Sequence, residues 1–164
     1  MPNWYLGKIR YQKEQENGSL KTINEAYLID AVSYTDAEAR LYKVMADNTP
    51  DFTVQSIGKM RLSDVFHFEG GDNWYKAKTI YVSIDDKNGK EKKVTNYMLV
   101  NAETAKEGIE RIDESLKTML VPFEVTDINL TTILDVFPYE ADEATDLPPN
   151  FKPIAELRGE LAAV

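Results

Sequence analysis

The feature that most constrains the fold of this chain is an internal repeat. Asn3-Trp4-Tyr5 near the N-terminus returns as Asn73-Trp74-Tyr75, 70 positions later. The match continues through both halves at an offset of 70 or 71, with Lys8 and Lys78, Tyr11 and Tyr81, Leu28 and Leu99, Ala31 and Ala102, and Asp64-Val65-Phe66 and Asp135-Val136-Phe137 as pairs. A repeat of this length is too long for a solenoid unit and short for an independent domain. It therefore predicts two similar lobes that share one core.

Each half begins with a pattern typical of a β-hairpin. Residues 3–12 and 74–84 alternate in polarity, as a strand with one buried face requires. Asn17-Gly18 and Asn88-Gly89 follow these segments and predict tight turns, because both residue types accept positive φ.

A helix is expected after each hairpin. Thr35–Glu38 and Thr104–Glu107 have the spacing of a capping box, in which the threonine oxygen and the acidic side chain each accept a backbone amide. They predict helices over 35–47 and from Thr104 to about 119, with Met119 on the buried side. The offset between these caps is 69, so we expect a short insertion near each helix.

Strand-forming residues close each half, at 52–68 and 123–137, and Gly58 interrupts the first of these segments. The predicted fold class is α+β: an internally duplicated strand-strand-helix-strand(s) repeat that forms one pseudo-twofold domain with antiparallel sheets and two helices. Both helices are expected on one face of the sheets.

The predicted single domain covers 1–138 and is built of two repeats, at about 3–68 and 73–137. Residues 139–164 are acidic and contain Pro148-Pro149, and they end in a short amphipathic segment. We expect this C-terminal tail to be mobile or packed on the body as a strap, or alternatively to dock a partner.

Composition excludes several classes of function. The chain has no cysteine, which excludes disulfides, thiol catalysis and thiolate metal sites. It shows neither a secretory leader nor the roughly 20 apolar residues of a membrane span, so a cytoplasmic protein is expected. The formal net charge of −9 argues against a protein that simply coats nucleic acid. The stretch from Pro138 onward holds six acids and two bases, a share of −4, which leaves −5 for the repeats.

Candidate catalytic residues are sparse. The single histidine, His67, lies between two phenylalanines and is expected to be structural. Asp64 and Asp135 occupy equivalent places, and a pseudo-twofold axis could pair them as a metal or acid/base site, although an aspartate before Val-Phe more often bonds local amides. No glycine-rich phosphate loop is present. We therefore expect no enzyme, no cofactor and no metal.

The positive signal is a strand face with aromatic and basic side chains. Alternation places these residues on one side of the first strand of each half: Trp4, Lys8, Arg10, Trp74, Lys76 and Lys78. An indole beside cations can stack a single-stranded base while the cations contact its phosphates, and such stacking contributes about 1 to 3 kcal/mol. In the alternative interpretation, the tryptophans pack in the junction between the halves and the lysines only protect a solvated face.

Four segments resemble an uncharacterised family of short proteins from Bacteroidetes genomes and their phages. They span 3–11, 25–31, 35–39 and 71–78, and the resemblance covers about residues 1–140. It implies a phage or mobile-element setting and transfers no catalytic residue. In architecture, the order of four strands and a helix from Phe52 to Met119 is similar to the single-stranded-DNA-binding folds of the Whirly and Pur type.

The sequence thus favours a non-enzymatic binding protein of a phage or mobile element that binds single-stranded nucleic acid through the Trp/Lys face. The alternative is an acidic interaction or anti-defence protein that sequesters a host factor, and the net charge of −9 motivates this alternative. Such a protein could instead sequester a small ligand in a cleft between the repeats. A host protein is accordingly the alternative partner, and no membrane is expected. The sequence leaves the oligomeric state open.

Overall fold

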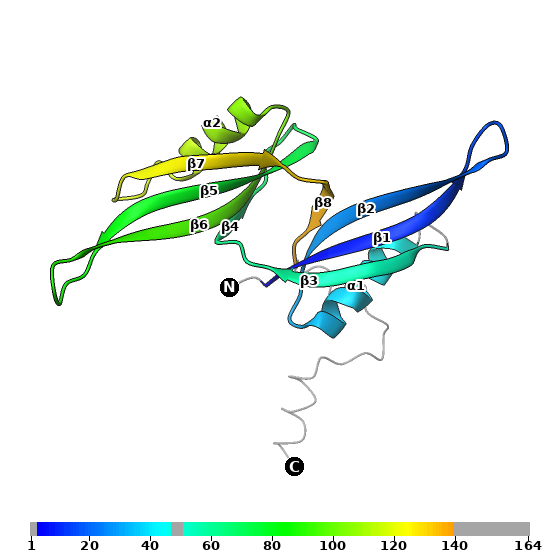
Figure 1. Cartoon of the computed structure of the whole chain (residues 1–164), viewed down its shortest axis with the longest axis horizontal. Coiled ribbons are helices and arrows are strands. Elements are labelled where there is room, and N and C mark those ends of the chain that lie inside the picture. Colours follow the sequence, from blue (N-terminus) through cyan, green and yellow to red (C-terminus); the bar gives the residue numbers. More distant parts are fainter. Residues whose placement is uncertain (1–2, 47–50, 140–164) are drawn as a thin grey trace, which may run out of the picture.

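The computed structural model describes residues 3–46 and 51–139, and these form two four-stranded sheets with one helix packed on each (Figure 1). In chain order the elements are β1 (Trp4–Glu14), β2 (Leu20–Asp30), α1 (Tyr34–Ala46), β3 (Thr53–Met60), β4 (Asp64–Phe66), β5 (Asn73–Ile84), β6 (Glu91–Ala102), α2 (Ala105–Ser115), β7 (Phe123–Leu130) and β8 (Ile133–Phe137). The predicted α+β class with two helices and mostly antiparallel sheets is confirmed. Apart from Tyr139, the predicted tail lies outside the described residues.

The last strand of each half pairs with the other half. In sheet A the order is β3-β1-β2-β8, and in sheet B it is β4-β6-β5-β7. Both exchanged strands pair in parallel, and their registers are equivalent: Val65 lies opposite Leu99, and Val136 lies opposite Leu28. The other ladders are antiparallel. This reciprocal exchange supports the internal duplication and joins the lobes through backbone hydrogen bonds.

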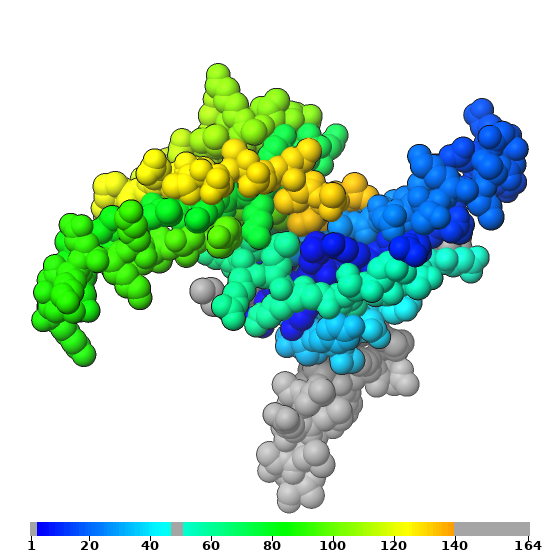
Figure 2. Space-filling view, viewed as in Figure 1, coloured from blue at the N-terminus to red at the C-terminus, as the bar shows by residue number. Residues whose placement is uncertain are grey.

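An approximate twofold rotation relates the two halves. The β1–β2 and β5–β6 hairpins extend to opposite ends of the molecule, and α1 and α2 lie on opposite sides of the view in Figure 1. The space-filling view in Figure 2 shows both hairpins as arms that protrude from the body. The turns contain Gly18 and Gly89 at φ +82° and +68°, as the Asn-Gly signals predict.

The first helix begins earlier than the sequence predicts. The amide of Asp36 donates to the hydroxyl of Ser33, and the Asp36 carboxylate accepts the amide of Val32, so Ser33 caps α1 and the predicted Thr35–Glu38 box is wrong. The Thr104 cap is confirmed, since the Glu107 amide donates to the Thr104 hydroxyl at 3.2 Å. Ser33 and Thr104 are 71 positions apart, so the expected insertion near each helix is not needed.

Each helix covers an apolar cluster on its own sheet. Leu41 of α1 packs in one cluster with Ile9 and Ile29 of sheet A, and all three are fully buried. Ile112 of α2 packs likewise with Met98 and Val100 of sheet B. These clusters leave the opposite face of each sheet without a helix.

An arginine of each helix holds the segment that follows the exchanged strand. The Arg40 guanidinium lies 4.9 Å from the ring centre of Tyr139, and Arg111 lies 5.1 Å from that of Phe68. Both partners are again 71 apart. Arg111 also donates to the carbonyls of Gly70 and Asn101 at 2.7 Å. The exchanged strands are therefore anchored at their ends by equivalent contacts.

Candidate nucleic-acid interface

Both tryptophans of the predicted face are buried. Trp4 is 6% exposed and Trp74 is 4% exposed, and they belong to one apolar cluster with Leu28, Leu99 and Ile133 at the junction of the lobes. His67 stacks on Trp74 with ring centres 5.6 Å apart. The expectation that these indoles are open for base stacking is wrong. The physical reason is that the helix-free faces of the two sheets meet at their inner ends, where the strand starts need an apolar cover.

The two cations that follow Trp4 remain exposed. Lys8 and Arg10 lie on the helix-free side of β1, because Ile9 between them is buried under α1. The guanidinium Nε of Arg10 donates to the Asn24 side chain at 3.3 Å. Among the described residues neither cation makes an ion pair. We call this side of sheet A the open face.

Uncharged polar residues surround these cations. In the ladders Lys8 lies opposite Ala26 and Ser56, and Arg10 lies opposite Asn24 and Thr53. A bulge between Lys8 and Ile9 adds Gln55 to β3 without a partner. A shallow depression of about 340 Å³ forms here, lined by Lys8, Ile9, Arg10, Asn24, Glu25, Ala26, Gln55 and Thr132.

The carboxylate of Glu25 is engaged away from the open face. Its two oxygens accept the hydroxyls of Tyr11 and Tyr27 at 2.7 and 2.6 Å. Burial and the hydrogen bond to Glu25 raise the pKa of Tyr27 well above its usual value of 10.0, and the hydrogen bond to Glu25 raises that of Tyr11. Because Glu25 pairs with Ile9 in the ladder, its side chain lies on the α1 side of the sheet. The depression therefore keeps a positive charge.

The equivalent strand face of sheet B differs in charge. Lys76 and Lys78 are half-buried, and the Lys76 ammonium lies 4.9 Å from the ring centre of Tyr97. Lys78 lies opposite Asp127 on β7, at the position where sheet A has Ser56 opposite Lys8. The structure thus brings Lys8 and Arg10 together opposite uncharged residues of β2 and β3. It places Lys76 and Lys78 on the other sheet, with Asp127 as a neighbour.

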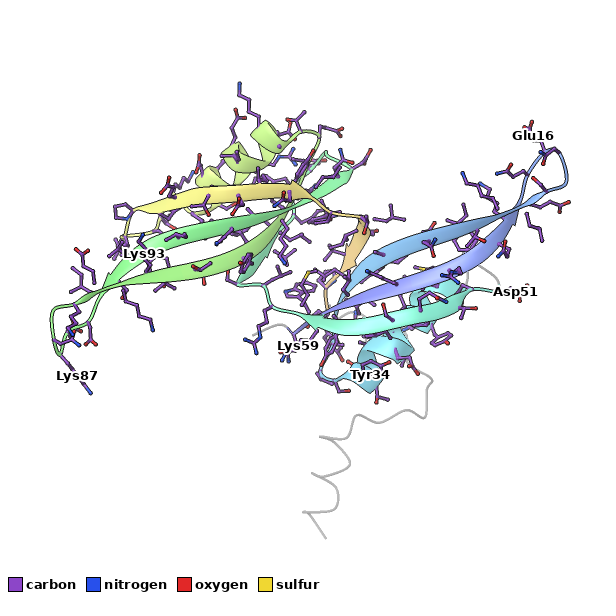
Figure 3. All side chains as sticks on the ribbon, in the orientation of Figure 1. Glu16, Tyr34, Asp51, Lys59, Lys87 and Lys93 are labelled. Atoms are coloured by element: carbon purple, nitrogen blue, oxygen red, sulfur yellow. The ribbon has the colours of Figure 1, made fainter. Side chains whose placement is uncertain are left out.

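The basic residues of the second hairpin do not extend the open face. Figure 3 shows Lys87 at the tip of the β5–β6 arm and Lys93 farther along it, while Glu16 lies at the tip of the β1–β2 arm. The β5–β6 arm also carries acids beside its lysines, namely Asp85, Asp86 and Glu91. Its net charge is therefore small.

Sequence reasoning missed the polar residues Asn24, Gln55 and Thr132 of the depression. Asn24 could have been found by counting back along the hairpin from its turn. Gln55 reaches the site only through the bulge, and Thr132 only through the exchange of β8, and neither feature has a signal in the sequence.

Asp64 is the first residue of β4 in sheet B, and Asp135 lies in β8 of sheet A. Asp135 accepts the amide of Val136 at 2.8 Å, which is the local role that an aspartate before Val-Phe often has. Across 3–46 and 51–139, no three His, Asp or Glu side chains gather as a metal ion would require. Within the same ranges, neither helix has the length and apolar character needed to span a bilayer.

No curated protein matches this chain. Residues 3–139, which include both lobes and the open face, match one family along their whole length. The chain therefore belongs to the family described as domain of unknown function DUF4494.

Proposed function

We propose that this protein is a non-enzymatic binding protein whose open face holds the phosphates of single-stranded nucleic acid. The observation that carries the proposal is the pair Lys8 and Arg10, exposed and without ion pairs among the described residues, at the rim of the depression. Cations among hydroxyl and amide groups suit phosphate oxygens, because those groups add neutral hydrogen bonds to the charge attraction.

The proposed mode of binding relies on phosphates more than on bases. The indoles expected to stack bases are buried, and the strand residues opposite the two cations are Thr53, Ser56, Asn24 and Ala26, none of them aromatic. Binding without base stacking is sequence-tolerant and strongly dependent on salt. The overall charge of −9 opposes long-range attraction, so affinity is expected to be modest and confined to this face.

The setting that we propose is a phage or mobile element, on the basis of the sequence resemblance. The similarity to Whirly and Pur folds stays a prediction, and it is weakened because β3 lies in sheet A whereas β4, β5 and β6 lie in sheet B.

The direct test is fluorescence anisotropy of a labelled oligothymidylate over a salt series. A Lys8→Glu/Arg10→Glu variant is expected to bind at least roughly tenfold more weakly than the wild type. The slope of log affinity against log salt concentration is expected to become shallower by about 0.7 per lost phosphate contact. Lys78→Glu is the matched control, because Lys78 is the counterpart of Lys8 but faces Asp127. Equal affinity of the wild type and the double variant, or equal losses in the double variant and the control, would contradict the proposal.

A further inference from the structure

The connection between α2 and β7 exposes three consecutive apolar side chains. Met119 is 37% exposed, Leu120 is 99% exposed and Val121 is 39% exposed. The sequence predicts a helix to about 119 with Met119 buried, but α2 ends at Ser115, with Leu116 as its C-cap. Leu120 has almost no contact with the body, so its side chain contributes nothing to the apolar clusters of the fold. We call residues Met119, Leu120 and Val121 the apolar loop.

The first half of the chain shows that the repeat does not need apolar residues here. At the offset of 71, which holds from Ser33 and Thr104 to Phe52 and Phe123, the counterparts of the apolar loop are Asn48, Thr49 and Pro50. A fully exposed leucine costs solubility and offers no folding energy. The apolar loop is thus a property of the second half alone.

Carboxylates gather on the part of α2 that leads into the apolar loop. Glu110, Asp113 and Glu114 are exposed on the last turns of the helix, and no basic residue stands in its last turn. Negative charge at a helix C-terminus is unfavourable for the helix macrodipole. The counterparts on α1 are Ala39, Tyr42 and Lys43, so these acids are also specific to the second half.

From these two independent asymmetries we infer that the apolar loop and the α2 acids form a docking surface for a partner protein. The partner has an apolar pocket that receives Leu120, bordered by lysine or arginine side chains that face Glu110, Asp113 and Glu114. Complementary charge favours this occupant over an anionic membrane, whose headgroups the three carboxylates repel. This inference goes beyond the proposed function, because it concerns α2 on sheet B and a basic partner, whereas the open face belongs to sheet A and is proposed to bind an anion. It gives the acidic-interaction alternative a specific place on the chain.

The test starts with a photo-crosslinking amino acid at position 120 of the full chain in host lysate. The captured protein is identified by mass spectrometry, purified and titrated against unlabelled variants. Met119→Asn/Leu120→Thr carries the residues of the first half, and Glu110→Lys/Asp113→Lys/Glu114→Lys reverses the charge. Thr118→Ala is the control for a neighbouring exposed change. Circular dichroism checks that each variant is folded.

Each of the two surface variants is expected to raise the dissociation constant at least tenfold, and the control is expected to leave it unchanged. Added salt is expected to weaken binding of the wild type. The inference is overturned if nothing is captured, if the captured protein binds all variants equally, or if the cross-links join two copies of this chain. Binding of the wild type to anionic phospholipid vesicles that is lost in the Met119→Asn/Leu120→Thr variant would also overturn it. These variants retain Lys8 and Arg10, so a negative result here leaves the nucleic-acid proposal standing.

Discussion

At the scale of single residues, the junction of the lobes depends on a few side chains that the fold buries almost entirely. Trp4 and Trp74 supply the largest rings of the junction cluster. Asn101, 2% exposed, accepts the amide of Phe68 at 2.7 Å and donates to the carbonyls of Phe68, Gly70 and Gly71. These contacts fix the turn into the second half, where Gly71 has φ +106° and an added Cβ would lie 2.8 Å from Ala102 Cα.

Replacement of a junction tryptophan is expected to destabilise the whole protein. Trp74→Ala removes a buried indole and leaves a cavity, at a cost of about 3 to 5 kcal/mol in the free energy of unfolding. Chemical denaturation measures this change, with the half-exposed Tyr97→Ala as control. A loss below about 1 kcal/mol for Trp74→Ala would show that the ring is not in a packed core.

Asn101 tests the hydrogen bonds of the turn with a change of almost no volume. Asn101→Asp turns a donor toward three carbonyl oxygens into a carboxylate, so we expect a loss of about 2 to 4 kcal/mol in the free energy of unfolding. The counterpart Asp30 accepts the Asn3 amide at 3.2 Å, which an amide oxygen can do equally well. Asp30→Asn should therefore cost little, and equal losses in the two variants would speak against the assigned bonds.

The tyrosines that bond Glu25 predict a loss of stability at alkaline pH. Unfolded tyrosine ionises near pH 10.0, whereas folded Tyr27 keeps its proton to higher pH because its pKa is raised. The unfolded state thus binds fewer protons above pH 10.0, and the free energy of unfolding falls as pH rises. Tyr27→Phe removes this contribution, so its stability should fall less steeply in urea titrations at alkaline pH. A slope unchanged from the wild type, or equally flattened by the exposed Tyr42→Phe, would contradict this.

At the scale of elements, the exchange of β4 and β8 makes each lobe depend on the other half of the chain. Sheet A takes its last strand from the C-terminal end, and β8 brings Ile133 into the junction cluster. The Arg40 contact with Tyr139 holds the end of the same segment. Neither sheet is therefore complete within one repeat.

Removal of β8 is expected to loosen sheet A, which β8 completes, rather than sheet B, which holds the strand that precedes β8 in the chain. A chain that ends after Thr132 lacks the strand that pairs with β2, so amides of β2 and α1 should exchange faster with deuterium than those of β5 and β6. A chain that ends after Tyr139 is the matched control. Faster exchange confined to β5 and β7 in the shorter chain would contradict the exchanged topology.

At the scale of the whole molecule, the sequence predicts the composition of the fold better than its connections. The repeat, the Asn-Gly turns and the Thr104 cap follow from local chemistry, which can be recognised because similar sequence segments occur in both halves. The Ser33 cap was missed because Thr35 and Glu38 also have the spacing of a capping box. The exchange of β4 and β8 was missed because a strand pattern states which side chains are buried and does not name the neighbouring strand.

The candidate site was predicted only in part, for the same physical reason. Alternation places Trp4, Lys8 and Arg10 on one face, but it cannot tell that the inner end of this face packs against the other lobe and that only its outer end meets solvent. Equivalent positions of the two halves also differ in charge, with Ser56 in one half and Asp127 in the other. The two halves therefore share a fold and present different surfaces.

Binding at the open face is tested most directly by two-dimensional NMR of the labelled protein during a titration with oligothymidylate at low salt. The predicted result is a set of salt-sensitive shift changes at the backbone amides of Lys8, Arg10, Asn24 and Gln55, with α2 and β7 unaffected. Shift changes that are absent, or that concentrate on sheet B and α2, would contradict nucleic-acid binding by this face.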